Sequence, residues 1–389
     1  MPEEPSRSVA ALGDVLDPNC FGGVPYQFFR AAKVQGFAGE AWRVNLPHLR
    51  RDRLLWNAGR VASGHRPGGF QFTAAGRKAA LARSNPGLLA TEIISFHQHV
   101  PPAEAVVAAG GTLNYYIDTT YEQLFSVYGL DRTLSPAVRR QALEYEREAF
   151  RAARRIVTCQ TWALRSLVND YGIPAEKCAA IMLAPNYPTH PGIRPRPEGA
   201  PGRDRPFVIG FIGKDWRRKG LKILVEAAAI LRRMGAKVTV RAMGFLAADC
   251  PYRDEIECLG FMGYIDKEKH FGPFLHSCDL GCLFSSAEAL GTAVLEFLGV
   301  GVPVAGFTVN GLSDALPASA SFRFPSDTTP EAIAEAFRSY LDDELRQESF
   351  RENAIRLAAS LTWERCVEEF RMLWEDGRVE KPFRLWEAA

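Results

Sequence analysis

The sequence predicts an α/β protein of two domains, each built on a parallel sheet covered on both faces by helices. Short apolar runs alternate with segments of helical periodicity in both halves of the chain, as in parallel sheets. A proline-rich stretch separates the two halves. The chain also has 389 residues, whereas a single core seldom grows past about 250–300 residues.

In the first half, apolar and β-branched runs predict strands, and apolar residues every three or four positions predict helices. The expected strands are residues 8–16, 92–97, 111–117, 155–159 and 180–183, and the expected helices are residues 26–33, 135–153 and 162–171. We assign residues 1–190 to an N-terminal domain. Residues 185–202 carry too many prolines for a helix or a central strand, which predicts a linker.

The alternation restarts after this linker. The expected strands are residues 207–212, 237–243, 279–284 and 302–306, and the expected helices are residues 220–234, 267–276, 291–300, 330–341, 344–358 and 363–374. We assign residues 200–362 to a C-terminal domain. Ligands of such sheets bind beyond the carboxyl ends of the strands, and a site shared by two domains can close on its substrate.

The composition argues against a nucleic-acid-binding, disulfide-rich, membrane-spanning or secreted protein. The net charge of +2 indicates no nucleic acid or other strongly charged partner. Eight cysteines in a chain of this length form no disulfide framework and fit no strong metal motif, which favours buried thiols in a reducing compartment. No run approaches the roughly 20 apolar residues of a membrane span, and the N-terminus lacks the pattern of a signal peptide. We therefore expect a cytoplasmic protein.

One region of the first half is strongly basic. Between Ala41 and Thr91 there are nine lysines and arginines against one acid, Asp52, with Trp42 and Trp56 interleaved. One interpretation is peripheral contact with anionic lipid headgroups at the inner face of a membrane, or with an acidic acceptor. The other is a solvated helix face with a partly buried tryptophan. The sequence leaves both open.

A basic loop leaves the strand at residues 207–212 and enters the next helix with a glycine at each end, Gly213 and Gly220. Lys214 and Lys219 lie at its mouth. A diphosphate leaving group gains negative charge as its bond to a sugar breaks, so positive side chains there stabilise the transition state. Arg217 and Arg218 either add to this positive field or, as we expect, face solvent. The spacing is neither G-x-G-x-x-G nor a Walker loop.

Two glutamates, Glu288 and Glu296, lie on either side of the start of a helix, with seven residues between them. The backbone N–H groups around Leu290, Gly291 and Thr292 would lie at the N-terminus of that helix, where the helix dipole favours a phosphate. The carboxylates would accept hydrogen bonds from hydroxyls. Phosphate and hydroxyls together predict a nucleotide-sugar site, although either acid alone is also compatible with a plain surface position.

The order of the basic loop, the two-glutamate element and Asn310-Gly311-Leu-Ser-Asp314 resembles the retaining glycosyltransferase family 4. The resemblance is strong over about residues 200–325 and weaker elsewhere. It implies the GT-B fold: two Rossmann-like domains facing a central cleft, with a C-terminal helix, here about residues 363–389, crossing back to the first domain.

The resemblance implies roles for residues of the second half. Glu288 would contact hydroxyls of the donor sugar, and Glu296 the ribose. Lys214 and Lys219 match the family's Arg/Lys pair on the diphosphate, with lysine in place of the usual arginine. The nucleotide base would lie near Ile265.

In the first half, Gly22 and Gly23 resemble the glycine loop that passes close to the donor phosphates, although an ordinary tight turn is the alternative. His99 matches the histidine that contacts the donor sugar, and His97 would point to the opposite side of a continuing strand. Asp118 either binds an acceptor hydroxyl or caps the following helix.

The resemblance implies a retaining transfer of sugar from a UDP- or GDP-sugar to a hydroxyl acceptor such as a glycan or a lipid-linked alcohol, as in polysaccharide biosynthesis. No metal and no further cofactor are expected, since no third ligand accompanies the two histidines and the donor half lacks a D-x-D after a strand. Two alternatives stay open: a nucleotide-sugar epimerase or phosphorylase on the same fold, and a non-catalytic nucleotide-binding scaffold.

Overall fold

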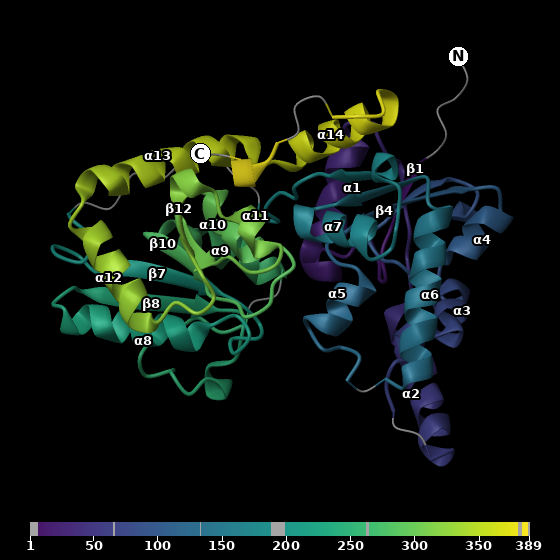
Figure 1. Cartoon of the computed structure of the whole chain (residues 1–389), viewed down its shortest axis with the longest axis horizontal. Helices are drawn as coiled ribbons and strands as arrows, with labels where there is room; N and C mark the ends of the chain where they lie inside the picture. Colours follow the sequence, from purple (N-terminus) through teal and green to yellow (C-terminus); the bar gives the residue numbers. More distant parts are fainter. Residues whose placement is uncertain are drawn as a thin grey trace. The chain divides into compact units, whose positions relative to one another are not determined.

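The computed structural model describes residues 7–64, 67–132, 134–187, 199–261, 264–379 and 383–387. The chain divides into two compact units. The first unit consists of Met1–Met182 and Cys366–Pro382, and the second of Leu183–Arg365 and Phe383–Ala389. Each unit has its own sheet with helices around it (Figure 1).

The first unit contains a parallel sheet of six strands in the order β2-β1-β3-β4-β5-β6. The strands are β1 Arg7–Ala10, β2 Glu40–Ala41, β3 Glu92–Ser95, β4 Thr112–Ile117, β5 Arg155–Thr158 and β6 Cys178–Ala180. The first strand is shorter than the expected 8–16, because the Gly13 N–H bonds back to the Ala11 carbonyl and turns the chain. The last strand begins two residues before the expected 180–183 and ends at Ala180. The two-residue β2 was too short for periodicity to reveal.

Five of the seven described helices of the first unit begin after a residue whose side chain caps them. Ser135 caps the helix before Pro136, and its hydroxyl accepts from the Val138 N–H at 3.3 Å. The helices are α1 Val24–Val34, α2 Leu46–Ala62, α3 Ala74–Ala82, α4 Ala103–Ala108, α5 Tyr121–Ser126, α6 Pro136–Ala152 and α7 Thr161–Asn169. The three helices expected for this half are all present.

The C-terminal helix α14, Trp363–Glu375, contributes its residues from Cys366 onward to the first unit. The Phe370 ring lies 4.9 Å from Phe28 and 4.8 Å from Tyr116, centroid to centroid. Further along the helix, Trp374 Nε1 donates to Glu92 Oε1 at 2.9 Å. This helix therefore completes the core of a unit whose other residues end at Met182, as expected for the GT-B fold.

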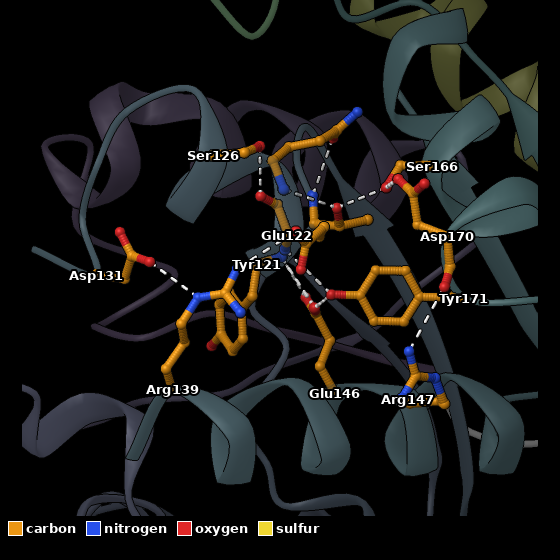
Figure 2. Close-up of polar contacts among 12 residues, drawn as sticks. Tyr121, Glu122, Ser126, Asp131, Arg139, Glu146, Arg147, Ser166, Asp170 and Tyr171 are labelled. Carbon is orange, nitrogen blue, oxygen red and sulfur yellow. Dashed lines mark hydrogen bonds and ion pairs between the residues drawn. The ribbon is translucent and has the colours of Figure 1, made fainter. Parts of the chain in front are cut away.

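A buried carboxyl group holds the loop after β4 in place (Figure 2). The Tyr121 N–H donates to both oxygens of Glu146, at 3.0 and 2.9 Å, and the Tyr171 hydroxyl donates to Glu146 Oε2. Burial raises the pKa of Glu146 to about 8, although these donors act in the opposite direction. The network ties α5, α6 and the segment after α7 together at the carboxyl end of β4.

The second unit contains another parallel six-stranded sheet, in the order β12-β11-β10-β7-β8-β9. The strands are β7 Phe207–Ile212, β8 Val238–Met243, β9 Glu257–Cys258, β10 Leu280–Leu283, β11 Val304–Phe307 and β12 Ser321–Phe324. The helices are α8 Leu221–Arg233, α9 Tyr264–His276, α10 Thr292–Leu298, α11 Leu312–Ala315, α12 Pro330–Leu341 and α13 Glu344–Ser360. The strand β12 and the short elements β9 and α11 were not expected.

Alternation along β7 decides which helix lies on which face of this sheet. Phe207, Ile209 and Phe211 join the buried cluster that α8 and α12 complete. Gly210 faces the other way, and a Cβ there would lie 2.6 Å from the Phe297 ring. A Cβ at its register partner Gly281 would lie closer still to that ring, at 2.2 Å. The two glycines therefore let α10, which carries Glu296, lie directly on the sheet.

The second unit begins at Leu183, earlier than the boundary expected at 190–200. Two contacts explain the difference. Trp363 Nε1 donates to the Pro185 carbonyl at 2.8 Å, and Glu296 binds the N–H groups of Asn186 and Tyr187. Most of the expected linker, residues 188–198, lies outside the described residues.

All eight cysteines are free thiols, and six of them are buried. Within the described part of the chain, no helix combines the length and hydropathy needed to cross a bilayer.

Candidate functional site

The basic loop of the second unit connects β7 to α8 and packs on the end of the neighbouring strand β10. Gly220 has a φ of 79°, and a Cβ there would lie 2.0 Å from the Phe284 carbonyl oxygen. The Ser286 N–H donates to the Arg218 carbonyl at 2.9 Å. These contacts fix the loop at the carboxyl ends of two adjacent strands, where ligands of such sheets bind.

Glu288 is the centre of a cluster of charges at this edge. Its Oε2 accepts from Lys219 Nζ and, at 3.2 Å, from the Ser285 hydroxyl. Arg218 NH1 lies 3.5 Å from the same oxygen and also donates to the Ala287 carbonyl. The expectation that Arg218 faces solvent is wrong, because the fixed loop turns its side chain inward; no sequence signal distinguished it from the exposed Arg217.

Lys214 lies apart from this cluster. It is exposed, and its Nζ lies 5.4 Å from the centroid of the Phe261 ring. Of the two lysines predicted to act together, the structure brings only Lys219 to Glu288. The predicted contact of both with a diphosphate stays a prediction.

The helix α10 begins at Thr292, directly after Gly291. Gly291 has a φ of 83°, and a Cβ there would lie 2.6 Å from Leu312 Cδ1, so the position requires glycine. The first-turn N–H groups of a helix have no partner within it. Leu290 is buried and Thr292 is partly exposed. Their predicted role in holding phosphate and sugar stays a prediction.

Glu296 is buried within α10, and only 6% of its surface is exposed. Its two oxygens accept from the backbone N–H groups of Asn186 and Tyr187, each at 3.0 Å. Two charge-assisted hydrogen bonds satisfy a carboxylate that would otherwise be costly to bury. The carboxylate thus anchors the start of the unit, and contact with ribose stays a prediction. Ile265 lies in α9, and its side chain is outside the described residues.

In the first unit, Gly22 and Gly23 follow β1 in a short turn. Gly22 has a φ of 70° and Gly23 a φ of 100°, and Gly23 caps the start of α1. Phe21 shares this turn, and its ring lies 5.9 Å from that of His97. The turn therefore lies beside the residues that follow the neighbouring strand β3.

His97 and His99 line the same cavity, which has a volume of about 350 Å³. The expectation that they point to opposite sides is wrong, because residues two positions apart share one face of a strand. The strand β3 in fact ends at Ser95, where the chain turns. The Ser95 hydroxyl donates to the Val100 carbonyl, and the His99 N–H donates to His97 Nδ1 at 3.1 Å. Burial lowers the pKa of His97 to about 4, so His97 is neutral at pH 7.

His99 is buried, and burial also holds its pKa well below the ordinary value. His99 Nδ1 lies 2.8 Å from the Gln71 carbonyl oxygen, which can only accept, so the neutral ring carries its proton on Nδ1. Its Nε2 then presents a lone pair, and among the described residues no donor reaches that atom.

The same cavity has basic walls that the sequence did not single out residue by residue. Arg50 and Arg53 come from α2 and Arg77 from α3, while Leu46 and Phe70 contribute apolar surface. None of the described residues that line it is acidic. Only the excess of positive charge between Ala41 and Thr91 pointed to these arginines.

Asp118 is exposed at the carboxyl end of β4, and its Oδ1 accepts from the Thr119 hydroxyl at 3.1 Å. The helix cap is Thr120, which forms a capping box with Gln123. The interpretation of Asp118 as that cap is therefore wrong, and contact with an acceptor stays a prediction. Across the described ranges, no group of three or more His, Cys, Asp and Glu side chains is arranged to hold a metal.

Residues 197–357 match the sequence model of a family described as Glycosyl transferases group 1. Alpha-D-kanosaminyltransferase of Streptomyces kanamyceticus is 31% identical over 167 residues, which are 40% of this chain and 42% of that protein. D-inositol 3-phosphate glycosyltransferase of Salinispora tropica is 26% identical over 196 residues, 47% of this chain and 41% of that protein. The chain spans less than half the length of these two curated relatives.

Solved structures resemble more of the chain. HepE of Anabaena in complex with UDP has a TM-score of 0.59 and 17% identity, covering 75% of this chain and 80% of that one. A glycosyltransferase from Rickettsia africae has a TM-score of 0.60 and 11% identity, covering 96% and 98%. These likenesses show the fold, two Rossmann-like units of the GT-B type, and the expected fold class is confirmed.

Proposed function

We propose that this chain, whose residues 197–357 match the group 1 glycosyltransferase model, is a member of that family and transfers a sugar, with retention of configuration, from a nucleoside-diphosphate sugar to a hydroxyl acceptor. UDP is the first donor nucleotide to test, since the structurally similar HepE binds UDP. GDP is the second.

The observation that carries the proposal is the convergence of charge at the carboxyl ends of β7 and β10. Lys219 and Arg218 meet Glu288 there, and the α10 N-terminus follows within a few residues. A lysine ammonium has three donors, so Lys219 can hold Glu288 and a diphosphate oxygen together. Cationic groups, a carboxylate for hydroxyls and helix N–H groups form a set suited to a sugar diphosphate.

In the proposed reaction the bond between the sugar C1 and the diphosphate oxygen breaks, and a bond from C1 to the acceptor oxygen forms on the same face. The acceptor proton passes to the departing diphosphate oxygen, so no enzymic nucleophile is needed. Lys219 and Arg218 stabilise the charge that develops on the diphosphate, and Glu288 positions the sugar by accepting from its hydroxyls.

A screen of nucleoside diphosphates and their sugars by thermal shift tests the donor class, since a ligand of the folded state raises the melting temperature. We expect a UDP- or GDP-sugar to raise it by several degrees and adenosine or cytidine diphosphates to raise it less. The absence of a response to every nucleotide would contradict the proposal.

The reaction type has its own test. With the donor identified, we expect the anomeric configuration of the product, read by NMR, to equal that of the donor, and EDTA to leave the rate unchanged. An inverted product would refute retention, and loss of activity in EDTA would refute metal independence. An epimerase would convert the donor without an acceptor, a phosphorylase would require phosphate, and a scaffold would bind the nucleotide without turnover.

We also propose peripheral membrane contact through α2, in a cytoplasmic protein. None of the residues of α2 is buried, and Leu54 and Leu55 are about two-thirds exposed, at 65% and 64%, next to Arg50 and Arg53. Exposed leucines among arginines suit an anionic bilayer surface. We expect sedimentation with vesicles containing phosphatidylserine, weakened by Leu54→Ser with Leu55→Ser; equal sedimentation of both proteins would contradict the contact.

A further inference from the structure

Phe21 is held in a backbone conformation that its side chain disfavours. Its φ is 48° and its ψ 42°, in the left-handed region, where a Cβ approaches the following carbonyl oxygen. Among the described residues, the other non-glycine residue with a positive φ is Asn310, and asparagine tolerates this region better than phenylalanine. The backbone of Phe21 therefore lowers the stability of the fold, which a glycine or an asparagine there would do far less.

Burial of the side chain does not offset this loss. Phe21 is 49% exposed, so about half of its surface still meets water. Its ring meets the His97 ring edge-on, with centroids 5.9 Å apart, and such a contact covers little of an aromatic face. A strained residue that gains so little from packing indicates a role in binding a ligand.

The turn presents this ring at the edge of the sheet where ligands bind. Phe21 follows β1 and His97 follows the neighbouring strand β3, so both lie beyond the carboxyl ends of adjacent parallel strands. Gly22 and Gly23, with φ of 70° and 100°, continue the left-handed turn. Cys20 and Gly23 are buried on either side of the exposed ring. The turn is therefore anchored at both ends, and the position of the ring is fixed before a ligand arrives.

A hydrogen-bond donor lies beside the ring. His97 Nδ1 accepts from the His99 N–H at 3.1 Å, so the neutral His97 ring carries its proton on Nε2. His97 is partly exposed, and no hydrogen bond within the described residues uses that proton. An apolar ring face with a donor at its side suits a sugar, whose ring has an apolar face of C–H groups and hydroxyls around its rim.

We propose that Phe21 is a sugar-stacking residue: its ring packs against the C–H face of a pyranose, and His97 Nε2 donates to a hydroxyl of the same sugar. This inference rests on the proposed glycosyl transfer and names a residue that selects the sugar. The pyranose is either the sugar of the donor or a free glycoside, since both carry the same C–H face.

The stability of a variant distinguishes this role from packing. Phe21→Asn keeps the left-handed turn and removes the ring, so we expect the melting temperature to stay unchanged or to rise by about 1–3 °C. Leu130→Asn is the control: Leu130 belongs to the same unit, is 50% exposed and has no positive φ, so no rise is expected. A fall of several degrees in Phe21→Asn would make Phe21 a packing residue and overturn the proposal.

Calorimetric titration of the full chain with UDP-glucose, UDP and the methyl glycosides of glucose, galactose and mannose tests sugar binding. We expect Phe21→Asn to weaken the binding of a sugar-bearing probe by at least about fivefold and to leave UDP affinity unchanged, because the ring buries an apolar sugar face. Phe21→Tyr keeps the ring and should keep the affinity, and Leu130→Asn should match the wild type. Equal affinity of wild type and Phe21→Asn for every sugar-bearing probe, or no binding of any of them, would overturn the proposal.

The same probes distinguish the two sources of the sugar. A loss confined to UDP-glucose identifies the donor sugar, and a loss confined to a methyl glycoside identifies a free glycoside. In steady-state kinetics, Phe21→Asn should raise KM for that substrate by at least about fivefold with a smaller change in kcat. A chain that binds a methyl glycoside through Phe21 but no nucleotide would refute the proposed function and keep this inference. Binding of nucleotide sugars and glycosides that does not depend on Phe21 would do the reverse, so the two failures are distinguishable.

Discussion

The charged site of the second unit and the cavity of the first unit differ in whether their buried polar groups are paired. In the second unit, Glu288 is paired with Lys219 and Arg218, and Glu296 is saturated by the N–H groups of Asn186 and Tyr187. Beside the cavity of the first unit, Arg77 and His99 keep atoms without any partner among the described residues. Both sites lie at the carboxyl ends of parallel strands, yet one is satisfied by the protein and the other is not.

Paired and unpaired buried groups have different consequences for stability and for ligand binding. Paired groups hold a loop or a helix start in place before a ligand arrives, which favours preorganisation for charge stabilisation. Unpaired buried groups weaken the fold, because they lose their hydrogen bonds to water and gain none in return. We therefore expect substitutions in the second unit to affect both catalysis and local stability, and removal of an unpaired group in the first unit to change stability little.

The largest expected effect is on catalysis. Lys219→Met should lower kcat by about 10²–10³, because it removes a cation that stabilises the leaving diphosphate. Lys222→Met is the matched control, since Lys222 lies three residues further along, is exposed and pairs with Glu226 at 3.7 Å. Steady-state kinetics with the identified donor measure both, and a wild-type rate in a folded Lys219→Met would remove Lys219 from the mechanism.

Glu296→Ala should release the start of the second unit. It removes two charge-assisted hydrogen bonds, so we expect the amides of Asn186 and Tyr187 to exchange about 10–100 times faster, from about 1.5–3 kcal/mol of lost stabilisation. Hydrogen exchange reads this directly, with the exposed Glu331→Ala of α12 as control. Unchanged protection would mean that the Glu296 carboxylate does not hold this segment.

Glu146 should make the stability of the first unit depend on pH. Its pKa is about 8 in the fold and near 4.5 when unfolded, so the folded state binds the proton more tightly. The stability that Glu146 contributes should therefore fall as pH rises from about 5 to 7.5, by up to about 1.4 kcal/mol per pH unit relative to Glu146→Gln.

Native-state hydrogen exchange in α5 and α6 measures this difference. Glu148→Gln is the control, because Glu148 is exposed on the same helix. If wild type and Glu146→Gln have parallel pH profiles, Glu146 is ionised in the fold and burial does not dominate its pKa.

The smallest expected effect is that of a cavity substitution on the free energy of unfolding without ligand. Arg77→Met should change the free energy of unfolding by less than about 1 kcal/mol, because it loses a cation–π contact and a long ion pair but also removes unpaired buried donors. Denaturation monitored by hydrogen exchange in α3 and α6 gives the value. A loss of several kcal/mol would make Arg77 a structural residue and remove the contrast between the two sites.

Much of the fold could be predicted from local pattern. The central strands and most of the helices follow from apolar periodicity and from the pattern of helix starts, such as Ser135 before Pro136. The two-residue edge strands could not be found in this way, because they have no periodicity of their own. The ends of β1 and β3 were placed too late, because the turns that follow depend on local hydrogen bonds, from the Gly13 N–H to the Ala11 carbonyl and from the Ser95 hydroxyl to the Val100 carbonyl, that apolar periodicity does not reveal.

The candidate site, like the fold, could be predicted in part from the sequence. The order of Lys219, Glu288, Gly291 and Glu296 was sufficient to recognise the family, because each motif follows a strand and the carboxyl ends of parallel strands share one edge. The position of Arg218 was not predictable, since an arginine in a basic loop is compatible with solvent until the loop is packed against Phe284. Arg77 and His99 lie 22 residues apart and meet only because α3 packs beside the turn after β3.

The sequence by itself determined that this is a two-unit α/β chain with the motifs of a group 1 glycosyltransferase, because those features depend on spacing along the chain. The tertiary structure alone decided which charges are paired: Glu288 with Lys219 and Arg218, Glu296 with backbone N–H groups, and Arg77 and His99 with nothing that the structure describes. Pairing and burial depend on distances between segments remote in sequence, and those distances are set by how the helices pack on each sheet.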